Sequence, residues 1–340
     1  MSTRAPKILV VTWSRDTAAV GRVVELLREK GAEVFRFDTD LYPSQLRLST
    51  GPDTIHLDGP HGSWDLSRLD GLWFRRDFTG YSSPDALYEA SAQREAREAV
   101  AGLLAVAAPF ELDPVERVKR ASHKLLQLRL AREVGLEIPD TLISNDADRV
   151  SAFARHHGGV IAKMHNCDLE LDENDRPVRV YATFLEPEQV EAFDGWGMGP
   201  LIFQQRIPKA RELRVVLVGK RAFAISMSVD GIPGAGDDWR AHGEEVLKTA
   251  RAAALPAELE RRLHALRRRL GLQYGAVDLI LTPDGRYVFL EYNPVGGFEF
   301  LEGVHGDAVP KALADLLYRG AAGRLDASPA ADLLPSLAVI

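Results

Sequence analysis

The sequence contains one cysteine, Cys167, among 340 residues. A single thiol excludes an internal disulfide and a thiolate-rich metal cluster, which is typical of proteins from a reducing compartment. The sequence also lacks any run of about 18 apolar residues, and its start, MSTRAPKILVVTW, has too short an apolar segment for a signal peptide. We therefore expect a cytoplasmic protein that has no membrane partner.

An excess of positive charge is missing as well. The chain has 42 Lys and Arg against 49 Asp and Glu, for a net charge of -7. Nucleic acids and anionic membranes bind concentrated Lys and Arg, so we expect no nucleic-acid partner. Hydrophobic residues make up 46% of the chain, which is ordinary for a folded globular protein, and the length allows two or three domains.

Two nucleotide-binding motifs are absent. KILVVTWS, a helical pattern closed by Gly31, and AEVFRFDTD predict a β-α-β unit, but the first turn lacks the G-x-G-x-x-G of a dinucleotide fold. No G-x-x-x-x-G-K-[ST] loop occurs anywhere. A bound nucleotide would therefore need phosphate partners drawn from separated basic residues.

Several basic residues have suggestive surroundings. GLWFRRDF carries Arg75 and Arg76, which indicate either solvated arginines on an edge strand or an anion site near a domain cleft. Lys124 lies in an expected amphipathic helix over 117–135, where a solvated lysine is the default. Lys163 lies within an apolar strand pattern, GVIAKMH, where a partner anion is favoured.

The segment TPDGRYVFLEYNP predicts an acidic hairpin. With Asp284-Gly285 as a two-residue turn, Asp278 falls opposite Glu291, and Asn293 shares the face of Glu291. Two carboxylates this close repel each other unless a cation lies between them, and an all-oxygen set suits Mg²⁺. The alternative is a set of acids on a solvated sheet face, and a three-residue turn would shift the register by one.

Magnesium usually reaches such a site bridged to nucleotide phosphates. Lys124 and Lys163 are the first candidates for binding those phosphates. Arg214 in ELR and Arg240 in DWR are further ones.

At this point the sequence resembles the ATP-grasp ligases, in particular the microviridin-type maturases that crosslink ribosomal peptides known as graspetides. The resemblance extends over nearly the whole chain, through ILVVTWSRD, LWFRR, IAKM, FQQRIPKARELRVVLVG, DWR and YGAVDLILTPDGRYVFLEYNPVGGFEFLE. It implies an α/β (α+β) ATP-grasp fold with an N-terminal pre-ATP-grasp β-α-β domain. The expected divisions are 1–113 for that domain, 114–200 and 201–325 for the central and C-terminal ATP-grasp subdomains, and 326–340 for a loosely ordered tail.

The resemblance also implies site residues and the cofactors ATP and Mg²⁺. Lys124 and Lys163 would hold the nucleotide phosphates, and Glu212 the ribose hydroxyls. The FQQRI strand would present the adenine edge with Gln204, Gln205, Arg206 and Ile207. Arg214 would face the transferred phosphoryl group and Arg240 would steady an acyl phosphate. Asp278, Glu291 and Asn293 match the magnesium ligands.

The implied activity is ATP-dependent macrocyclisation of a ribosomally made precursor peptide. Phosphorylation of an Asp or Glu side chain would precede attack by a Thr or Ser hydroxyl or a Lys amine, giving ω-ester or ω-amide crosslinks, ADP and phosphate. A ligase that joins a small carboxylate to an amine or amino acid would share every nucleotide residue. A non-catalytic nucleotide-binding module would be expected to lose a magnesium ligand, and all three are present.

The resemblance finally implies a docking surface for the leader part of the peptide, at roughly 168–194 on the central subdomain, together with a homodimeric assembly. The acids there could pair with a basic leader residue, although a solvated acidic helix is equally compatible. The expected peptide-contacting residues are Glu186, Glu188, Glu191, Asp194, Arg75 and Arg76.

Overall fold

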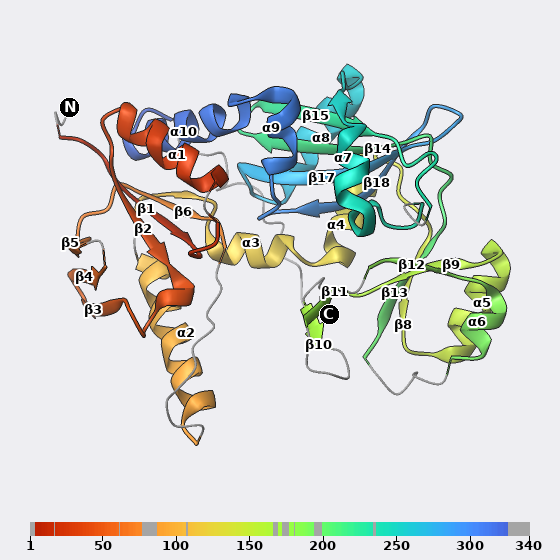
Figure 1. Ribbon diagram of the computed structural model, residues 1–340, viewed down its shortest axis with the longest axis horizontal. Coiled ribbons are helices and arrows are strands. Elements are labelled where there is room, and N and C mark those ends of the chain that lie inside the picture. The colour runs from red at the N-terminus through yellow and green to blue at the C-terminus, as the bar shows by residue number, and fades with distance from the viewer. Residues whose placement is uncertain are drawn as a thin grey trace.

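The structure is a computed structural model, and it describes residues 4–16, 18–60, 62–76, 87–106, 108–165, 169–171, 177–179, 181–193, 199–233 and 236–325. Its elements form three groups around a shared middle (Figure 1). Cys167 and Asp194 lie outside the described residues. Helix and strand alternate as the mixed pattern of the sequence predicts, so the α/β (α+β) class is confirmed.

The N-terminal group is built on a four-stranded parallel sheet in the order β2-β1-β6-β7. The apolar run of β1 is buried on both faces, as expected for a strand inside a parallel sheet. A three-stranded antiparallel sheet, β3-β4-β5, lies beside it. The elements are β1 (Lys7–Thr12), α1 (Ala18–Glu29), β2 (Glu33–Asp38), β3 (Arg47–Gly51), β4 (Thr54–Gly59), β5 (Gly62–Asp65), β6 (Gly71–Phe74), α2 (Glu89–Val106) and β7 (Phe110–Leu112).

The central group has an antiparallel sheet in the order β12-β9-β13-β8, covered by α5 and α6. Asp146 caps α5 by accepting from the Arg149 N–H at 3.2 Å. The elements are α3 (Val115–Ala121), α4 (Lys124–Glu133), β8 (Thr141–Ser144), α5 (Ala147–His157), β9 (Val160–Lys163), β10 (Leu169–Leu171), β11 (Pro177–Arg179), β12 (Thr183–Leu185), α6 (Pro187–Glu191) and β13 (Leu201–Gln205).

The C-terminal group has a five-stranded antiparallel sheet in the order β16-β15-β14-β17-β18. Along β14, residues 213, 215 and 217 enter a buried apolar cluster, while Glu212 and Arg214 point to the opposite face. The elements are β14 (Arg211–Val218), β15 (Arg221–Met227), α7 (Gly243–Lys248), β16 (Arg251–Ala252), α8 (Ala257–Arg269), β17 (Tyr274–Leu281), β18 (Tyr287–Asn293), α9 (Glu302–His305) and α10 (Ala308–Ala321).

Helix α10 joins the two ends of the chain. It lies beside α1 in Figure 1, and one apolar cluster combines α1, β1, β14 and α10. Arg22 with Asp307 at 2.8 Å and Lys30 with Asp315 at 2.6 Å form ion pairs across this contact. The N-terminal and C-terminal groups therefore share a core.

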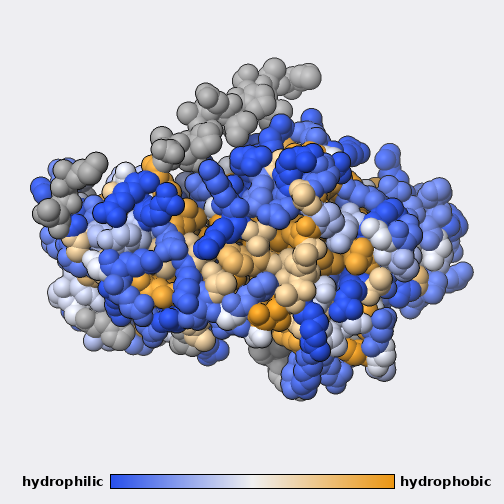
Figure 2. All heavy atoms as spheres, turned by 90° about the horizontal axis from the view of Figure 1, so that it is seen from above, coloured by the Kyte–Doolittle hydropathy of each residue, from blue (hydrophilic) through white to orange (hydrophobic). Residues whose placement is uncertain are grey.

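Seen from above, apolar residues form a band across the middle of the molecular surface, between hydrophilic margins (Figure 2).

The β17–β18 hairpin differs from the prediction in two ways that cancel. Its turn has three residues, because the Thr282 N–H bonds the carbonyl of Arg286 at 2.9 Å, so the two-residue turn is wrong. A β-bulge between Asp278 and Leu279 then shifts the register back by one residue, with Leu290 as the extra residue of β18. Asp278 consequently pairs with Glu291, as predicted.

Two other expectations also need correction. The single helix over 117–135 is interrupted, because α3 ends at Ala121 and α4 begins at Lys124. Strand β6 lies inside its sheet, so the arginines that follow it do not belong to an edge strand. The side chain of Arg75 has no solvent exposure, which excludes the solvated reading for that residue.

Candidate active site

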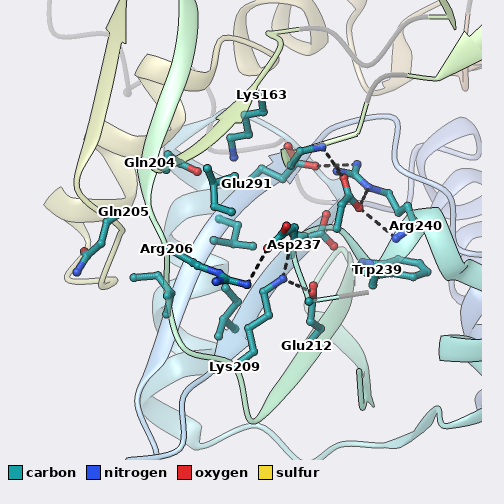
Figure 3. Close-up of a pocket in the computed structure, with 18 of the residues that line it drawn as sticks. Lys163, Gln204, Gln205, Arg206, Lys209, Glu212, Asp237, Trp239, Arg240 and Glu291 are labelled. Carbon is teal, nitrogen blue, oxygen red and sulfur yellow. Dashed lines mark hydrogen bonds and ion pairs between the residues drawn. The ribbon is translucent and has the colours of Figure 1, made fainter. Parts of the chain in front are cut away.

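A cavity lies between the C-terminal sheet and strands β9 and β13 of the central sheet, and it encloses about 900 Å³ including space open to solvent. Ile161, Ile280 and Leu290 supply apolar wall. Lys124, Arg240 and Glu291 lie together and form the charged end of the cavity. Lys163 points into it from β9, opposite the C-terminal sheet (Figure 3). Deep clefts with apolar walls and a few convergent polar groups are the usual form of small-molecule sites.

At the charged end a row of three side chains runs across neighbouring strands, and two of them, Asp278 and Glu291, line the cavity. Arg214 of β14 pairs with Asp278 of β17, which in turn pairs with Glu291 of β18. One guanidinium nitrogen, Nη1 of Arg214, donates to both oxygens of Asp278 at 2.9 and 3.0 Å. Lys124 donates its Nζ to Oε2 of Glu291 at 2.6 Å. The two opposed carboxylates predicted from the hairpin are thus each held by a basic partner.

These surroundings shift the pKa values of the two carboxylates in opposite directions. Burial raises the pKa of Asp278, and the neighbouring charge of Glu291 adds to that effect against the pull of Arg214. Burial alone would raise the pKa of Glu291 too, but Lys124, Lys163 and Arg240 together hold it well below its usual range. Glu291 therefore carries a firm negative charge at neutral pH.

Asn293 ends β18 opposite Ala276, two residues beyond Glu291. Its Oδ1 accepts from the N–H of Val295 at 3.1 Å, and this bond fixes the start of the following loop. An amide oxygen has two lone pairs, so one remains for a further partner. The predicted trio therefore consists of one opposed carboxylate pair and an amide at the edge of the same face.

The other end of the cavity is formed by the segment after β13. Gln204, Gln205, Arg206 and Ile207, which were predicted to meet the adenine edge, all line this cavity. Gln204 is buried and donates to Oγ1 of Thr141 at 2.9 Å, whereas the Gln205 side chain points away from the cavity (Figure 3). Arg206 lies over the ring of Phe184, 4.4 Å from its centroid. This end offers backbone groups and apolar walls of the kind that suit a flat ring.

Glu212 lines the cavity between these two ends. Burial raises its pKa, and Lys209 donates to Oε1 of Glu212 at 2.7 Å. The sequence analysis did not single out Lys209, although its place three residues before Glu212 is a signal that could have found it. Alternation along β9 could likewise have found Ile161, which shares the face of Lys163.

Arg240 lies on a short 3-10 helix, Trp239–His242, whose Trp239 also lines the cavity. Its Nε and Nη2 donate to the two oxygens of Asp238 at 2.8 and 2.9 Å. Its Nη1 lies 3.8 Å from Oε1 of Glu291. Asp237 and Asp238 lie three and two residues before the predicted arginine, and neither was among the residues predicted from the sequence.

The two arginines after β6 lie in different surroundings. Arg75 donates to the carbonyl of Val295 and lies 3.3 Å from Oε1 of Glu299, so it holds the loop that follows Asn293. Arg76 is about one-third exposed, and its Nε lies 3.4 Å from Oδ2 of Asp16. The guanidinium of Arg76 also lies over the ring of Trp13. Neither arginine lines the cavity described above.

The predicted docking acids lie on and before α6. Glu186 and Gln189 form a capping box at its start, and Glu191 pairs with Arg155 at 2.9 Å. Glu186, Glu188 and Glu191 are all exposed. They form an acidic patch that directly follows β12.

Comparisons with known proteins find similar chains over most of the sequence. A family model described as the MvdD pre-ATP grasp domain matches residues 7–119. A Chryseobacterium gregarium RiPP-associated ATP-grasp ligase, solved with ADP and a leader and core peptide, is 29% identical with a TM-score of 0.87, over 92% of this chain and 96% of that one. The Microcystis aeruginosa macrocyclase MdnC, solved with the precursor peptide MdnA, is 32% identical with a TM-score of 0.82, over 92% and 98%. MdnB from the same organism is 32% identical with a TM-score of 0.76, over 92% and 99%.

The search of curated proteins finds no match. Within the part of the chain that the structure describes, none of the helices is long and apolar enough to cross a membrane.

Proposed function

Since the chain belongs to the ATP-grasp ligases that mature ribosomal peptides, we propose that it is an ATP-dependent peptide macrocyclase. It would phosphorylate Asp or Glu side chains of a precursor peptide and close them onto Thr, Ser or Lys side chains. The two macrocyclases at 32% identity support this proposal, as does the ligase solved with ADP and peptide.

The observation that carries the proposal is the row Arg214, Asp278 and Glu291 across three strands. Hard carboxylate and amide oxygens on one sheet face fit Mg²⁺, so Asp278, Glu291 and Asn293 are the residues that would hold it. When bound, the metal would neutralise charge on the phosphates of ATP. Lys124 and Lys163 would take phosphate oxygens beside it.

The remaining cavity residues fit the rest of the nucleotide. Backbone groups of 205–207 would meet the adenine edge between Ile161, Ile280 and Leu290. Glu212, which already accepts one hydrogen bond from Lys209, would accept from ribose hydroxyls. Arg214 and Arg240 flank the carboxylate pair and would stabilise charge on the phosphoryl group during its transfer.

A carboxylate must be activated before ring closure, because its oxygen is a poor leaving group. A carboxylate oxygen of the peptide attacks the γ-phosphorus, its P–O bond forms and ADP leaves. The hydroxyl or amine of a second side chain then attacks the acyl carbon, phosphate leaves with the former carboxylate oxygen, and a proton is released. The net change is the loss of one water from the peptide for each crosslink.

Peptide contacts come from two surfaces in this proposal. The acidic patch of Glu186, Glu188 and Glu191, with Asp194, would receive a basic leader residue. The side chain of Arg76 is about one-third exposed and would bind a carboxylate of the core peptide, whereas Arg75 supports the loop of Val295. We further propose a cytoplasmic homodimer and retain the domain limits 1–113, 114–200, 201–325 and 326–340.

Mass spectrometry tests the function. The protein is incubated with the candidate peptide encoded beside it, ATP and Mg²⁺, and the peptide should lose one water for each ring in an ATP-dependent manner. ATP turnover with free amino acids and none with the peptide would favour a small-molecule ligase instead.

A further inference from the structure

The carboxylate of Asp238 connects two parts of the molecule. It is 5% exposed, and its Oδ1 accepts from the N–H and Nε of Arg240 at 3.1 and 2.8 Å. Its Oδ2 accepts from Nη2 of Arg240 at 2.9 Å and from the N–H of Ala182 at 3.2 Å. One buried carboxylate is thus shared by the cavity arginine and by the backbone just before β12.

Strand β12 forms one edge of the central sheet and pairs with β9, which ends at Lys163. Its outer edge meets the aspartate pair, because Oδ2 of Asp237 accepts from the N–H of Phe184 at 3.4 Å. Oδ1 of Asp237 binds Arg206 at 3.0 Å. The two aspartates therefore accept from the N–H of Ala182, just before β12, and from the N–H of Phe184 within it, as the backbone of a neighbouring strand would.

Arg240 depends on this contact for its orientation. Two parallel N–H···O bonds to one carboxylate fix the plane of a guanidinium as well as its position. That plane places Nη1 3.8 Å from Oε1 of Glu291. Asp238 in turn accepts from the backbone N–H of Ala182 in the opposite subdomain. The orientation of Arg240 therefore depends on the relative position of the two subdomains.

From these contacts, and resting on the proposed function, we infer that Asp238 is a positioning residue for the phosphoryl and acyl transfer. It orients the guanidinium of Arg240 toward the reacting groups. Because Asp238 also binds the backbone before β12, this orientation depends on the position of β12. Asp238 itself contacts no reacting atom in this account. Its effect on turnover passes through Arg240.

A double-mutant cycle tests the inference. Asp238→Asn, Arg240→Lys and the double variant are compared for kcat and for KM of ATP, because Lys keeps the charge but cannot form the paired bonds. Asp238→Asn alone should lower kcat by roughly 10- to 100-fold, as loss of an orienting partner does elsewhere. In the Arg240→Lys background, the further change Asp238→Asn should lower kcat by less than about threefold. Equal losses in both backgrounds, or near-normal kcat in Asp238→Asn, would overturn the inference.

Further readouts separate positioning from a fold defect. Asp238→Asn should speed amide hydrogen exchange in the segment 182–185 while thermal unfolding stays cooperative. Unchanged exchange would overturn the link to β12. Glu244→Gln, the same chemical change at an exposed site nearby, is the matched control. The cycle is measured both by ADP release and by the mass of the peptide. If the enzyme crosslinks no peptide, the proposed function is wrong. The rate of ADP release still tests the role of Asp238 in that case.

Discussion

Asp278 and Glu291 face each other on β17 and β18 because a three-residue turn and a β-bulge shift the register by one residue in opposite senses. Each carboxylate has its own cation, Arg214 for Asp278 and Lys124 for Glu291. The two partly buried acids therefore form two ion pairs side by side, which lowers the free-energy cost of placing them together. This arrangement leads to the first prediction.

Glu291→Gln should abolish turnover while leaving the fold intact. The change keeps the shape of the side chain but removes an anionic ligand and the partner of Lys124. The loss in kcat should reach at least about 100-fold, since even outer partners of a metal ligand are worth 10- to 100-fold. Steady-state ADP release and circular dichroism measure the two parts. Glu137→Gln, which alters an exposed ion pair, serves as control, and near-normal activity of Glu291→Gln would contradict the site.

Arg75 and Arg76 should differ in what their loss disturbs. Arg75→Ala removes a fully buried guanidinium that binds the Val295 carbonyl and pairs with Asp16 and Glu299, so the free energy of unfolding should fall by about 3–5 kcal/mol. Arg76→Ala should leave stability within about 1 kcal/mol but raise KM for the peptide. Urea unfolding and peptide titrations measure these effects. Unchanged peptide KM in Arg76→Ala would place the carboxylate subsite elsewhere.

Charge reversal at the docking patch should weaken peptide binding. In Glu186→Lys, Glu188→Lys and Glu191→Lys combined, a basic leader residue would meet like charge, and Arg155 would lose its partner. The Kd for the peptide should rise at least tenfold while the Kd for ADP stays the same. Calorimetry measures both, and reversal of the exposed Glu95 and Glu98 on α2 is the control. Equal peptide affinity in both variants would exclude the patch.

Asp113 should make stability depend on pH. Burial raises its pKa to about 7, although the carboxylate accepts from the N–H groups of Gln273 and Tyr274. Between about pH 4 and 7 the folded protein then keeps a proton that the unfolded chain has released, so this residue's contribution to stability falls as pH rises and levels off above 7.

Relative to Asp113→Asn, the wild-type free energy of unfolding should thus decrease by up to roughly 4 kcal/mol across that window. Urea unfolding at several pH values measures the difference between the two proteins. A wild-type free energy of unfolding that stays level or rises with pH, relative to that of Asp113→Asn, would show that the carboxylate is ionised in the folded state.

Much of the site could be predicted because strand alternation is a local rule. Asp278 opposite Glu291, with Asn293 on the face of Glu291, follows from a hairpin register and from period-two alternation along β18. Glu212 was implied by the resemblance to the ATP-grasp ligases, and it shares one face of β14 with Arg214. The bulge at Leu290 could not be predicted, since nothing in YVFLEYN marks an extra residue and tertiary packing decides it.

Contacts between distant segments were equally beyond the sequence. The burial of Arg75 against Val295 joins residues more than 200 positions apart, and no local pattern indicates it. The hydrogen bond from the Ala182 N–H to Asp238 also joins distant segments, and no local pattern indicates it. By contrast, the break before Lys124 has a local cause that was overlooked, because Ser122 and His123 are weak helix formers.

The most direct test of the proposed chemistry follows oxygen atoms. A precursor peptide with oxygen-18 in its Asp and Glu carboxylates is incubated with the protein, ATP and Mg²⁺, and the released phosphate is analysed by mass spectrometry. If a peptide carboxylate is phosphorylated before ring closure, each crosslink should deliver one oxygen-18 to phosphate. Crosslinked peptide accompanied by unlabelled phosphate would contradict the account.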